Sequence, residues 1–307
     1  KEVEIWNGKY LSKVTVKKTN DSAKLKKIYF SDGSHIKCTD YHRFKLAGEN
    51  KYITKDSDVC RAGDLKVGMK LFSLDEFPVI NNKVRRCSND FTQFDAYTSG
   101  YHFGFMALHN KNEKDNTCNG GILLDSSNSM ETIGKLSVSN IEEVKMDDGE
   151  EDYVRVFLSK TTLEVPINSD IKTKMQWLSG LIDYDFEKVD CMLGMKRVKY
   201  EFQHSLKLLL HTLGVSPIIE PHDKSVVSMI AGGIKTLDST LYNVFIDSRG
   251  LAQLVNLGLQ VHEKIKLKEV TNRLVVVAIE DLDGEEPTWC FTEEDFGQGV
   301  FNGVLTY

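Results

Sequence analysis

Thr39 and His42 stand three residues apart in the stretch CTDYHRF, directly after a predicted strand. An imidazole can pass a proton to or from a reacting group, and a neighbouring hydroxyl can hold the bond that reacts. The TxxH pattern alone is weak, because Thr and His are ordinary turn residues. Here it follows a strand, an Asp32-Gly33 turn and a second strand, and this context favours a site for acid–base chemistry.

Two carboxylates form a second candidate site. The stretch WLSGLIDYDF, residues 177–186, is an apolar helix pattern with small residues at Ser179 and Gly180, and it ends in Asp183 and Asp185. Small residues let backbones approach closely, and carboxylates can hold a divalent metal ion. Acids at a helix C-terminus oppose the helix dipole, which favours a functional reason for them. A buried helix that happens to end in acids is the alternative.

The elements around these residues change in kind along the chain. Residues 1–80 show period-two alternation and turn signals, which predict short strands. The segments 94–110, 170–186 and 198–213 have helical patterns, with Ser169 or Asp170 as the N-cap of the second. A strand pattern also lies at 239–247, and further strand patterns follow from residue 272. The cysteines lack CxxC spacing, which argues against a zinc site or a disulfide framework.

This order predicts one β domain that is interrupted by an insertion. The closing segment, 268–307, is too short to fold alone, so it should complete the β domain begun by residues 1–80. Residues 85–265 form an α+β block with a rough internal repeat, whose halves are about 92–160 and 168–262.

The charge of the chain does not indicate nucleic-acid binding. The formal net charge is −6, and residues 81–270 together carry −4, where a DNA-binding surface should be basic. No run of 18 apolar residues is present, and the N-terminus lacks a signal-peptide pattern. We therefore expect no membrane partner and a cytoplasmic location, including a nucleoid or viral intracellular setting.

The first β segment resembles a known family. The stretches WNGKYLSKVTVKKTN and LKKIYFSDGSHIKCTDYHRFKL are similar to the Hint (intein) splicing domain, in particular the inteins of ribonucleotide reductases. The resemblance implies an all-β Hint domain in which His42 donates a proton to the amide nitrogen of the scissile bond. Thr39 would help to hold and strain that bond. Cys290 falls on a position where an Asp or Cys assists the first step.

The resemblance also implies residues beyond those given. The family begins with a nucleophilic Cys or Ser upstream of the position of Lys1, and it ends with an Asn or Gln after the position of Tyr307. The family's His after FTE falls on Gly297 or a neighbour. We therefore expect that residues 1–307 alone do not splice.

The stretch LSGLIDYDF resembles the LAGLIDADG motif of homing endonucleases, which commonly interrupt inteins. The resemblance implies an all-β Hint domain interrupted by an α+β LAGLIDADG-type domain of two repeats, with Asp185 as a metal-binding acid. The partner helix is AYTSGYHFGFMAL, residues 96–108, with Gly100 and Gly104 as the contact residues. Phe105 stands where the second acid belongs. The endonuclease is therefore interpreted as inactive.

Three functional hypotheses remain. The first is intein autoprocessing (protein splicing) with host (extein) segments as partners and no cofactor. The second is a catalytically dead interaction or structural domain within a larger assembly. The third is an active endonuclease or nickase that pairs Asp185 with Asp90 or Asp95, needs Mg²⁺ and binds double-stranded DNA; in the first hypothesis any DNA binding would be weak.

Overall fold

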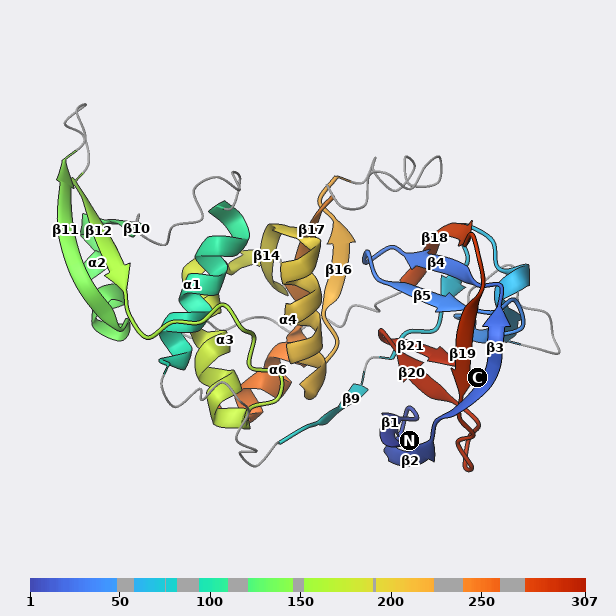
Figure 1. Cartoon of the computed structure of the whole chain (residues 1–307). Helices are drawn as coiled ribbons and strands as arrows, with labels where there is room; N and C mark the ends of the chain where they lie inside the picture. The colour runs from blue at the N-terminus through green and yellow to red at the C-terminus, as the bar shows by residue number, and fades with distance from the viewer. Residues whose placement is uncertain are drawn as a thin grey trace. The chain divides into compact units, whose positions relative to one another are not determined.

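The computed structural model describes residues 1–48, 58–74, 76–81, 94–109, 121–145, 152–189, 192–223, 240–259 and 274–307. The chain forms two compact units (Figure 1). Unit 1 comprises Lys1–Val79, Lys196–Gly250 and Lys266–Tyr307, and unit 2 comprises Ile80–Met195 and Leu251–Ile265. No helix in these described ranges is long and apolar enough to cross a membrane.

The two ends of the chain contribute most of the strands of unit 1. The opening segment holds β1 (Glu2–Trp6), β2 (Leu11–Thr15), β3 (Lys17–Ala23), β4 (Lys26–Phe30), β5 (His35–Cys38), β6 (Arg43–Lys45), β7 (Val59–Arg61), the short 3-10 helix Ala62–Asp64, β8 (Lys70–Leu71) and β9 (Glu76–Val79). The closing segment holds β18 (Leu274–Asp281), β19 (Glu286–Cys290), β20 (Gly299–Phe301) and β21 (Val304–Thr306).

Strands from the opening and closing segments share sheets. β18 pairs antiparallel with β4 and β8, β19 pairs with β3, and β21 pairs with β6. Figure 1 shows β18 beside β4 and β19 beside β3. The side chains between them form one apolar core. Its fully buried members include Ile28, Phe30, Phe44, Leu71, Val276 and Val304. The two ends of the chain therefore bury their apolar faces against each other, as an interrupted β domain requires.

The β4–β5 hairpin turns at Asp32-Gly33, as its sequence predicts. Gly33 has φ +81°, a left-handed conformation that favours glycine. The Asp32 carboxylate accepts hydrogen bonds from the backbone N–H and the hydroxyl of Ser34, at 3.0 and 2.6 Å. The carboxylate therefore closes the turn from inside.

The segment Lys196–Gly250 belongs to unit 1, whereas the sequence placed it in the interrupting block. It contains α4 (Tyr200–Thr212), β15 (Leu213–Val215), β16 (Ile218–Pro221) and β17 (Leu241–Ile246). β15 pairs with β9, and Gln203 and Lys207 of α4 both contact Asp32. The sequence boundary followed the helical pattern alone, which does not reveal where a helix makes its polar contacts.

Unit 2 is built around two helices in close contact. Its elements are α1 (Ala96–His109), β10 (Ile122–Asp125), α2 (Ser126–Lys135), β11 (Val138–Lys145), β12 (Asp152–Leu158), α3 (Ile171–Asp185) and β13 (Glu187–Val189). β14 (Met192–Lys199) and α6 (Ser248–Asn256) cross the boundary between the units. Asp170 caps α3 by accepting from the N–H of Thr173 at 2.8 Å, which confirms the predicted N-cap.

Glycines set the separation of α1 and α3. A Cβ at Gly100 would overlap the carbonyl oxygen of Trp177, and a Cβ at Gly180 would overlap that of Tyr97. The predicted contact through small residues is confirmed. Because Gly100 faces Trp177 and Gly104 faces Tyr184, the helices run in the same direction, and their C-terminal ends lie together.

The order of elements repeats along the interrupting block. α1 is followed by β10, α2, β11 and β12, and α3 is followed by β13, β14, α4, β15, β16 and β17. The strand order is β10-β12-β11 in the first sheet, and the second sheet contains the run β14-β17-β16. In the first half, β10 is followed by α2 and then by the antiparallel pair β11 and β12, and β12 lies beside β10. In the second half, β14 is followed by α4 and later by the antiparallel pair β16 and β17, and β17 lies beside β14.

Candidate functional site

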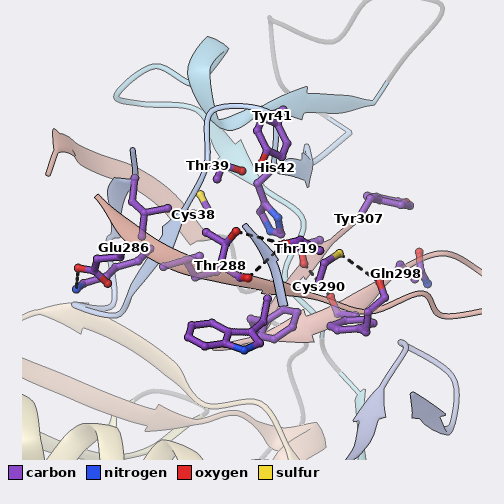
Figure 2. Close-up of a pocket in the computed structure, with 18 of the residues that line it drawn as sticks. Thr19, Cys38, Thr39, Tyr41, His42, Glu286, Thr288, Cys290, Gln298 and Tyr307 are labelled. Carbon is purple, nitrogen blue, oxygen red and sulfur yellow. Dashed lines mark hydrogen bonds and ion pairs between the residues drawn. The ribbon is translucent and has the colours of Figure 1, made fainter. Parts of the chain in front are cut away.

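A pocket of about 420 Å³ opens in unit 1 (Figure 2). Its walls come from the loop after β5, from β19 and from the β20–β21 hairpin, with Thr19 of β3. The polar and reactive side chains that line it are Thr19, Lys37, Cys38, Thr39, Tyr41, His42, Glu286, Thr288, Cys290, Gln298, Thr306 and Tyr307.

The pocket brings together three residues that the sequence singled out. Thr39 and His42 come from the loop after β5, and Cys290 is the last residue of β19. Figure 2 shows all three side chains around the same cavity. A hydroxyl, an imidazole and a thiol from segments about 250 residues apart in the sequence therefore face one space.

Backbone hydrogen bonds hold the loop that carries His42. The N–H of His42 donates to the carbonyl of Thr39 at 3.1 Å, which closes a turn. The carbonyl of His42 accepts from the N–H of Ala62 at 2.7 Å, and that of Asp40 accepts from Gly63 at 2.9 Å. The imidazole meets the ring of Phe44 at 5.2 Å, and Phe44 is fully buried. The β-domain core therefore anchors this imidazole.

The imidazole of His42 is largely buried, and one of its ring nitrogens makes no hydrogen bond among the described residues. Burial, with a smaller contribution from the charge of Arg43, lowers the pKa of His42 below its ordinary value. Nε2 of His42 is buried and has no hydrogen-bond partner among the described residues. Because a buried polar atom without a partner costs stability, its retention favours a role with a group that enters the pocket.

The two thiols of the pocket differ in accessibility. Cys38 is buried, and burial raises its pKa to about 12, which keeps it a protonated thiol. Cys290 is exposed, and its Sγ lies 3.4 Å from the carbonyl oxygen of Phe291. Cys290 is therefore the thiol of this pocket that another reactant can reach.

The sequence did not identify several residues of the pocket. Thr19 and Thr288 lie on paired strands with their hydroxyls 3.2 Å apart, and Gln298 donates to the carbonyl of Asn7 at 2.7 Å. Gly297, where the family's histidine was expected, lines the pocket but carries no side chain. Strand alternation could have placed Thr288 and Cys290 on one face, since they are two residues apart.

A buried carboxylate shapes the loop after β19. Glu293 is 3% exposed and accepts from Asn7 Nδ2 at 3.0 Å and from the N–H groups of Phe296 and Gly297 at 2.6 and 3.1 Å. Burial opposes the ionisation of Glu293, but these hydrogen bonds together lower its pKa to about 2.

Glu293 should make the fold acid-labile. A carboxyl whose pKa is lowered by folding contributes stability that is present above its unfolded pKa of about 4.3 and is lost as the pH falls. For Glu293 that loss runs down to about pH 2. We expect Glu293→Gln to lower the unfolding free energy at pH 7 and to flatten its decline below pH 5. Urea unfolding between pH 2 and pH 7 measures both; an unchanged acid profile would exclude this role.

The second sequence candidate lies at the C-terminal ends of α1 and α3. Asp185 is the last residue of α3, and Phe105 lies next to Gly104, whose backbone meets Tyr184. The ring of Phe105 packs 6.2 Å from that of Tyr184 in a small apolar cluster. The position expected to supply a second acid therefore presents an aromatic ring beside the end of α3.

Two other acids of this unit, Asp183 and Asp95, make hydrogen bonds or ion pairs of their own. Asp183 accepts from the hydroxyl of Tyr97 at 2.7 Å and pairs with Lys135 at 3.3 Å. Asp95 accepts from the N–H of Thr98 at 2.6 Å at the start of α1, the opposite end of that helix from Phe105. Asp95 is therefore poorly placed as a substitute acid, and Asp90 lies outside the described residues.

These side chains do not fit a shared divalent metal ion. A two-helix site needs a carboxylate from each helix, and the α1 side offers the ring of Phe105. Across the described part of the chain, no group of three His, Cys, Asp or Glu side chains is placed to hold a metal ion.

The chain is similar to the ribonucleoside-diphosphate reductase large subunit of Invertebrate iridescent virus 6, with 28% identity over 328 residues. The match covers all of this chain but 33% of that protein, so the chain spans about a third of the relative's length. No protein-family profile matches the chain.

Proposed function

We propose that this chain is the greater part of an intein that interrupts a ribonucleoside-diphosphate reductase large subunit. In this proposal, a Hint-type β domain performs protein splicing, and a LAGLIDADG-type α+β domain interrupts it. The pocket that Thr39, His42 and Cys290 share is the observation that carries the proposal. The partial match to a viral reductase subunit supports the proposed host.

The pocket suits an acyl shift at a peptide bond. In this step, a thiol or hydroxyl upstream of Lys1 attacks the preceding carbonyl carbon, so that a C–S or C–O bond forms and the C–N bond breaks. Neutral His42 takes the proton of the nucleophile and returns it to the departing amine. Thr39 is placed to hold the strained amide, and Cys290 assists as an accessible thiol beside it.

The chemistry is tested on the longer reading frame with its natural flanking segments. A thioester formed by the acyl shift is cleaved by an added thiol such as dithiothreitol, which releases the upstream segment. Mass spectrometry of the released segment should show its new C-terminus at the residue before the nucleophile. Because a hydroxyl nucleophile would give an oxoester, which thiols cleave poorly, the protein is also treated with hydroxylamine. If the upstream segment stays attached with both reagents, the splicing assignment fails.

We also propose that the interrupting domain belongs to the LAGLIDADG type and no longer cuts DNA. The glycine contact of α1 and α3 and the repeated order of helices and strands support the assignment to this type. Two observations support the loss of DNA cleavage. Phe105 places an aromatic ring at the helix end, and Asp183 is held by an ion pair with Lys135 and a hydrogen bond from Tyr97.

The inactive state of the interrupting domain predicts an absence of nicking. Supercoiled plasmid that carries the uninterrupted reductase gene should remain intact with the protein and Mg²⁺ or Mn²⁺ over several hours. An active two-repeat LAGLIDADG endonuclease serves as the positive control. Cleavage that Asp185→Asn abolishes would overturn the proposal and restore the endonuclease hypothesis.

A further inference from the structure

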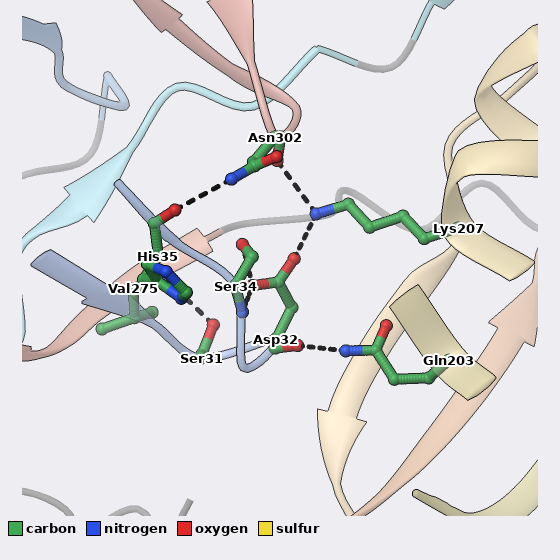
Figure 3. A network of polar contacts seen from close by, with 8 residues as sticks. All are labelled: Ser31, Asp32, Ser34, His35, Gln203, Lys207, Val275 and Asn302. Atoms are coloured by element: carbon green, nitrogen blue, oxygen red, sulfur yellow. Dashed lines mark hydrogen bonds and ion pairs between the residues drawn. The ribbon is translucent and has the colours of Figure 1, made fainter. Parts of the chain in front are cut away.

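Lys207 of α4 contacts the turns of two different hairpins (Figure 3). Its ammonium pairs with the carboxylate of Asp32 in the β4–β5 turn. The same nitrogen donates to the carbonyl of Asn302 at 2.9 Å, in the β20–β21 turn. One cation on a helix therefore joins two loops that are 270 residues apart in the sequence.

Further hydrogen bonds close this network. Gln203, one turn earlier on α4, donates to the carbonyl of Asp32 at 2.7 Å, and Nδ2 of Asn302 donates to the carbonyl of His35 at 2.8 Å. Asp32, Gln203 and Lys207 are at most 5% exposed. Water screens a buried ion pair little, so its geometry is held more tightly than that of a surface pair.

Both hairpins lead from this network to the pocket. β5 begins at His35, beside the Asp32 turn, and continues into the loop of Thr39 and His42. β21 begins two residues after Asn302 and continues to Thr306 and Tyr307, which also line the pocket.

At the pocket end, β21 pairs with β6, the strand that follows the His42 loop. Thr306 is the register partner of Phe44 in β6, and the N–H of Tyr307 donates to the carbonyl of Arg43 at 3.0 Å. Lys207 thus joins the two turns, and backbone pairing joins β21 to β6, the strand that follows the His42 loop.

We propose that Lys207 is a positioning residue for the splicing pocket, and that α4 sets the relative placement of the His42 loop and β21 through it. This inference rests on the proposed function of the pocket. We call the contacts of Gln203 and Lys207 with the two turns the clamp. Because the clamp residues lie in Lys196–Gly250, removal of the whole interrupting block should loosen the pocket.

The clamp is tested with three variants of the Lys1–Tyr307 chain. Asp32→Asn with Lys207→Met removes the ion pair without leaving a buried unpaired charge, and Asn-Gly keeps the favoured turn. Lys207→Arg preserves a cation that can reach both acceptors. Leu210→Ala removes a fully buried side chain of the same helix without touching the network.

Hydrogen exchange of individual amides is the first measurement. In the Asp32→Asn/Lys207→Met variant, the N–H groups of His42 and Tyr307 should exchange about tenfold faster, while α1 and α3 keep their wild-type rates. The Lys207→Arg variant should stay close to wild type. Leu210→Ala should loosen α4 without this selective effect at the pocket. Unchanged exchange at His42 and Tyr307, or a uniform rise that includes α1 and α3, would overturn the clamp.

Thiol-triggered cleavage in the longer reading frame separates this inference from the proposed function. The Asp32→Asn/Lys207→Met variant should cleave at least about tenfold more slowly than wild type, with a shifted pH profile. The Lys207→Arg variant should cleave at close to the wild-type rate. If the wild type does not cleave, the splicing assignment fails while the exchange rates still test the clamp. If the Asp32→Asn/Lys207→Met variant cleaves as fast as an active wild type, with an unchanged pH profile, the positioning role of Lys207 fails.

Discussion

Gly180→Ala should unfold or severely loosen unit 2. The new methyl group would overlap the carbonyl oxygen of Tyr97 and lie 3.0 Å from the backbone nitrogen of Tyr101. Backbone atoms cannot rotate away as a side chain can, so α1 and α3 must separate. Their separation would expose the apolar side chains packed between them, including Trp177, which is fully buried. We expect a loss of at least about 3 kcal/mol in unfolding free energy.

Gly134→Ala is the matched control for this substitution. Gly134 lies in α2 of the same unit, and a Cβ there meets no atom within 4 Å. Alanine at an open helical position should be neutral or stabilising by up to about 1 kcal/mol. Thermal and urea unfolding followed by circular dichroism compares the two. Equal midpoints for Gly180→Ala and wild type would contradict the close contact of α1 and α3.

His42→Ala should abolish cleavage at the upstream junction of the longer reading frame. Without the imidazole, the pocket loses the group that we propose takes the nucleophile's proton and returns it to the departing amine, so we expect a loss of at least about 100-fold in rate. The fold should survive, because Nε2 of His42 makes no hydrogen bond within the described residues. The change in unfolding free energy should be under about 1 kcal/mol, also when Thr39→Ala is added.

His35→Gln is the control for His42→Ala. His35 begins β5, the strand that leads into the His42 loop, but its ring packs 5.7 Å from that of Tyr29 and does not line the pocket. The His35→Gln variant should cleave at a rate within about threefold of wild type. Cleavage by His42→Ala at the wild-type rate, in a folded protein, would remove the imidazole from the mechanism.

The wild-type pH profile follows from the same imidazole. Burial lowers the pKa of His42, so the neutral ring that accepts the proton predominates above that lowered value. The rate should therefore persist as the pH falls through about 6.5, the ordinary pKa of histidine, and decline only at lower pH. A decline centred above pH 7 would require a different titrating group.

Much of the local structure could be predicted from the sequence. The alternation of apolar residues and the Asp32-Gly33 dipeptide locate the β4–β5 hairpin, and the small residues Gly100 and Gly180 locate the helix contact. The hairpin depends on near neighbours in the sequence, which a pattern reports directly, whereas the helix contact was expected from the resemblance. The helix α2 was missed, because its stretch SSNSMETIGK is mostly polar.

The polar contacts of α4 could not be predicted. A helical pattern shows that Leu206, Leu209 and Leu210 share a face, but it does not show which distant turn receives Gln203 and Lys207. A lysine in such a pattern normally reaches water, and here the buried carboxylate of Asp32 and the carbonyl of Asn302 accept from the buried ammonium of Lys207. Asn302-Gly303 forms the turn between β20 and β21, and Asn-Gly is the strongest short hairpin signal.

The candidate site was predicted in part. Thr39, His42 and Cys290 came from resemblance and line one pocket. The residues that frame them, including Thr19 and Gln298, have unremarkable types, and their position depends on strand pairings that close only in three dimensions.

The joining of the flanking segments tests the central proposal most directly. The longer reading frame, with reductase sequence on both sides, is expressed, and the intact masses of all products are measured. We predict two products: a continuous reductase segment with the interrupting chain removed, and the excised chain itself. Persistence of the unspliced precursor from the wild-type frame, in folded form and with no joined segment, would contradict the account.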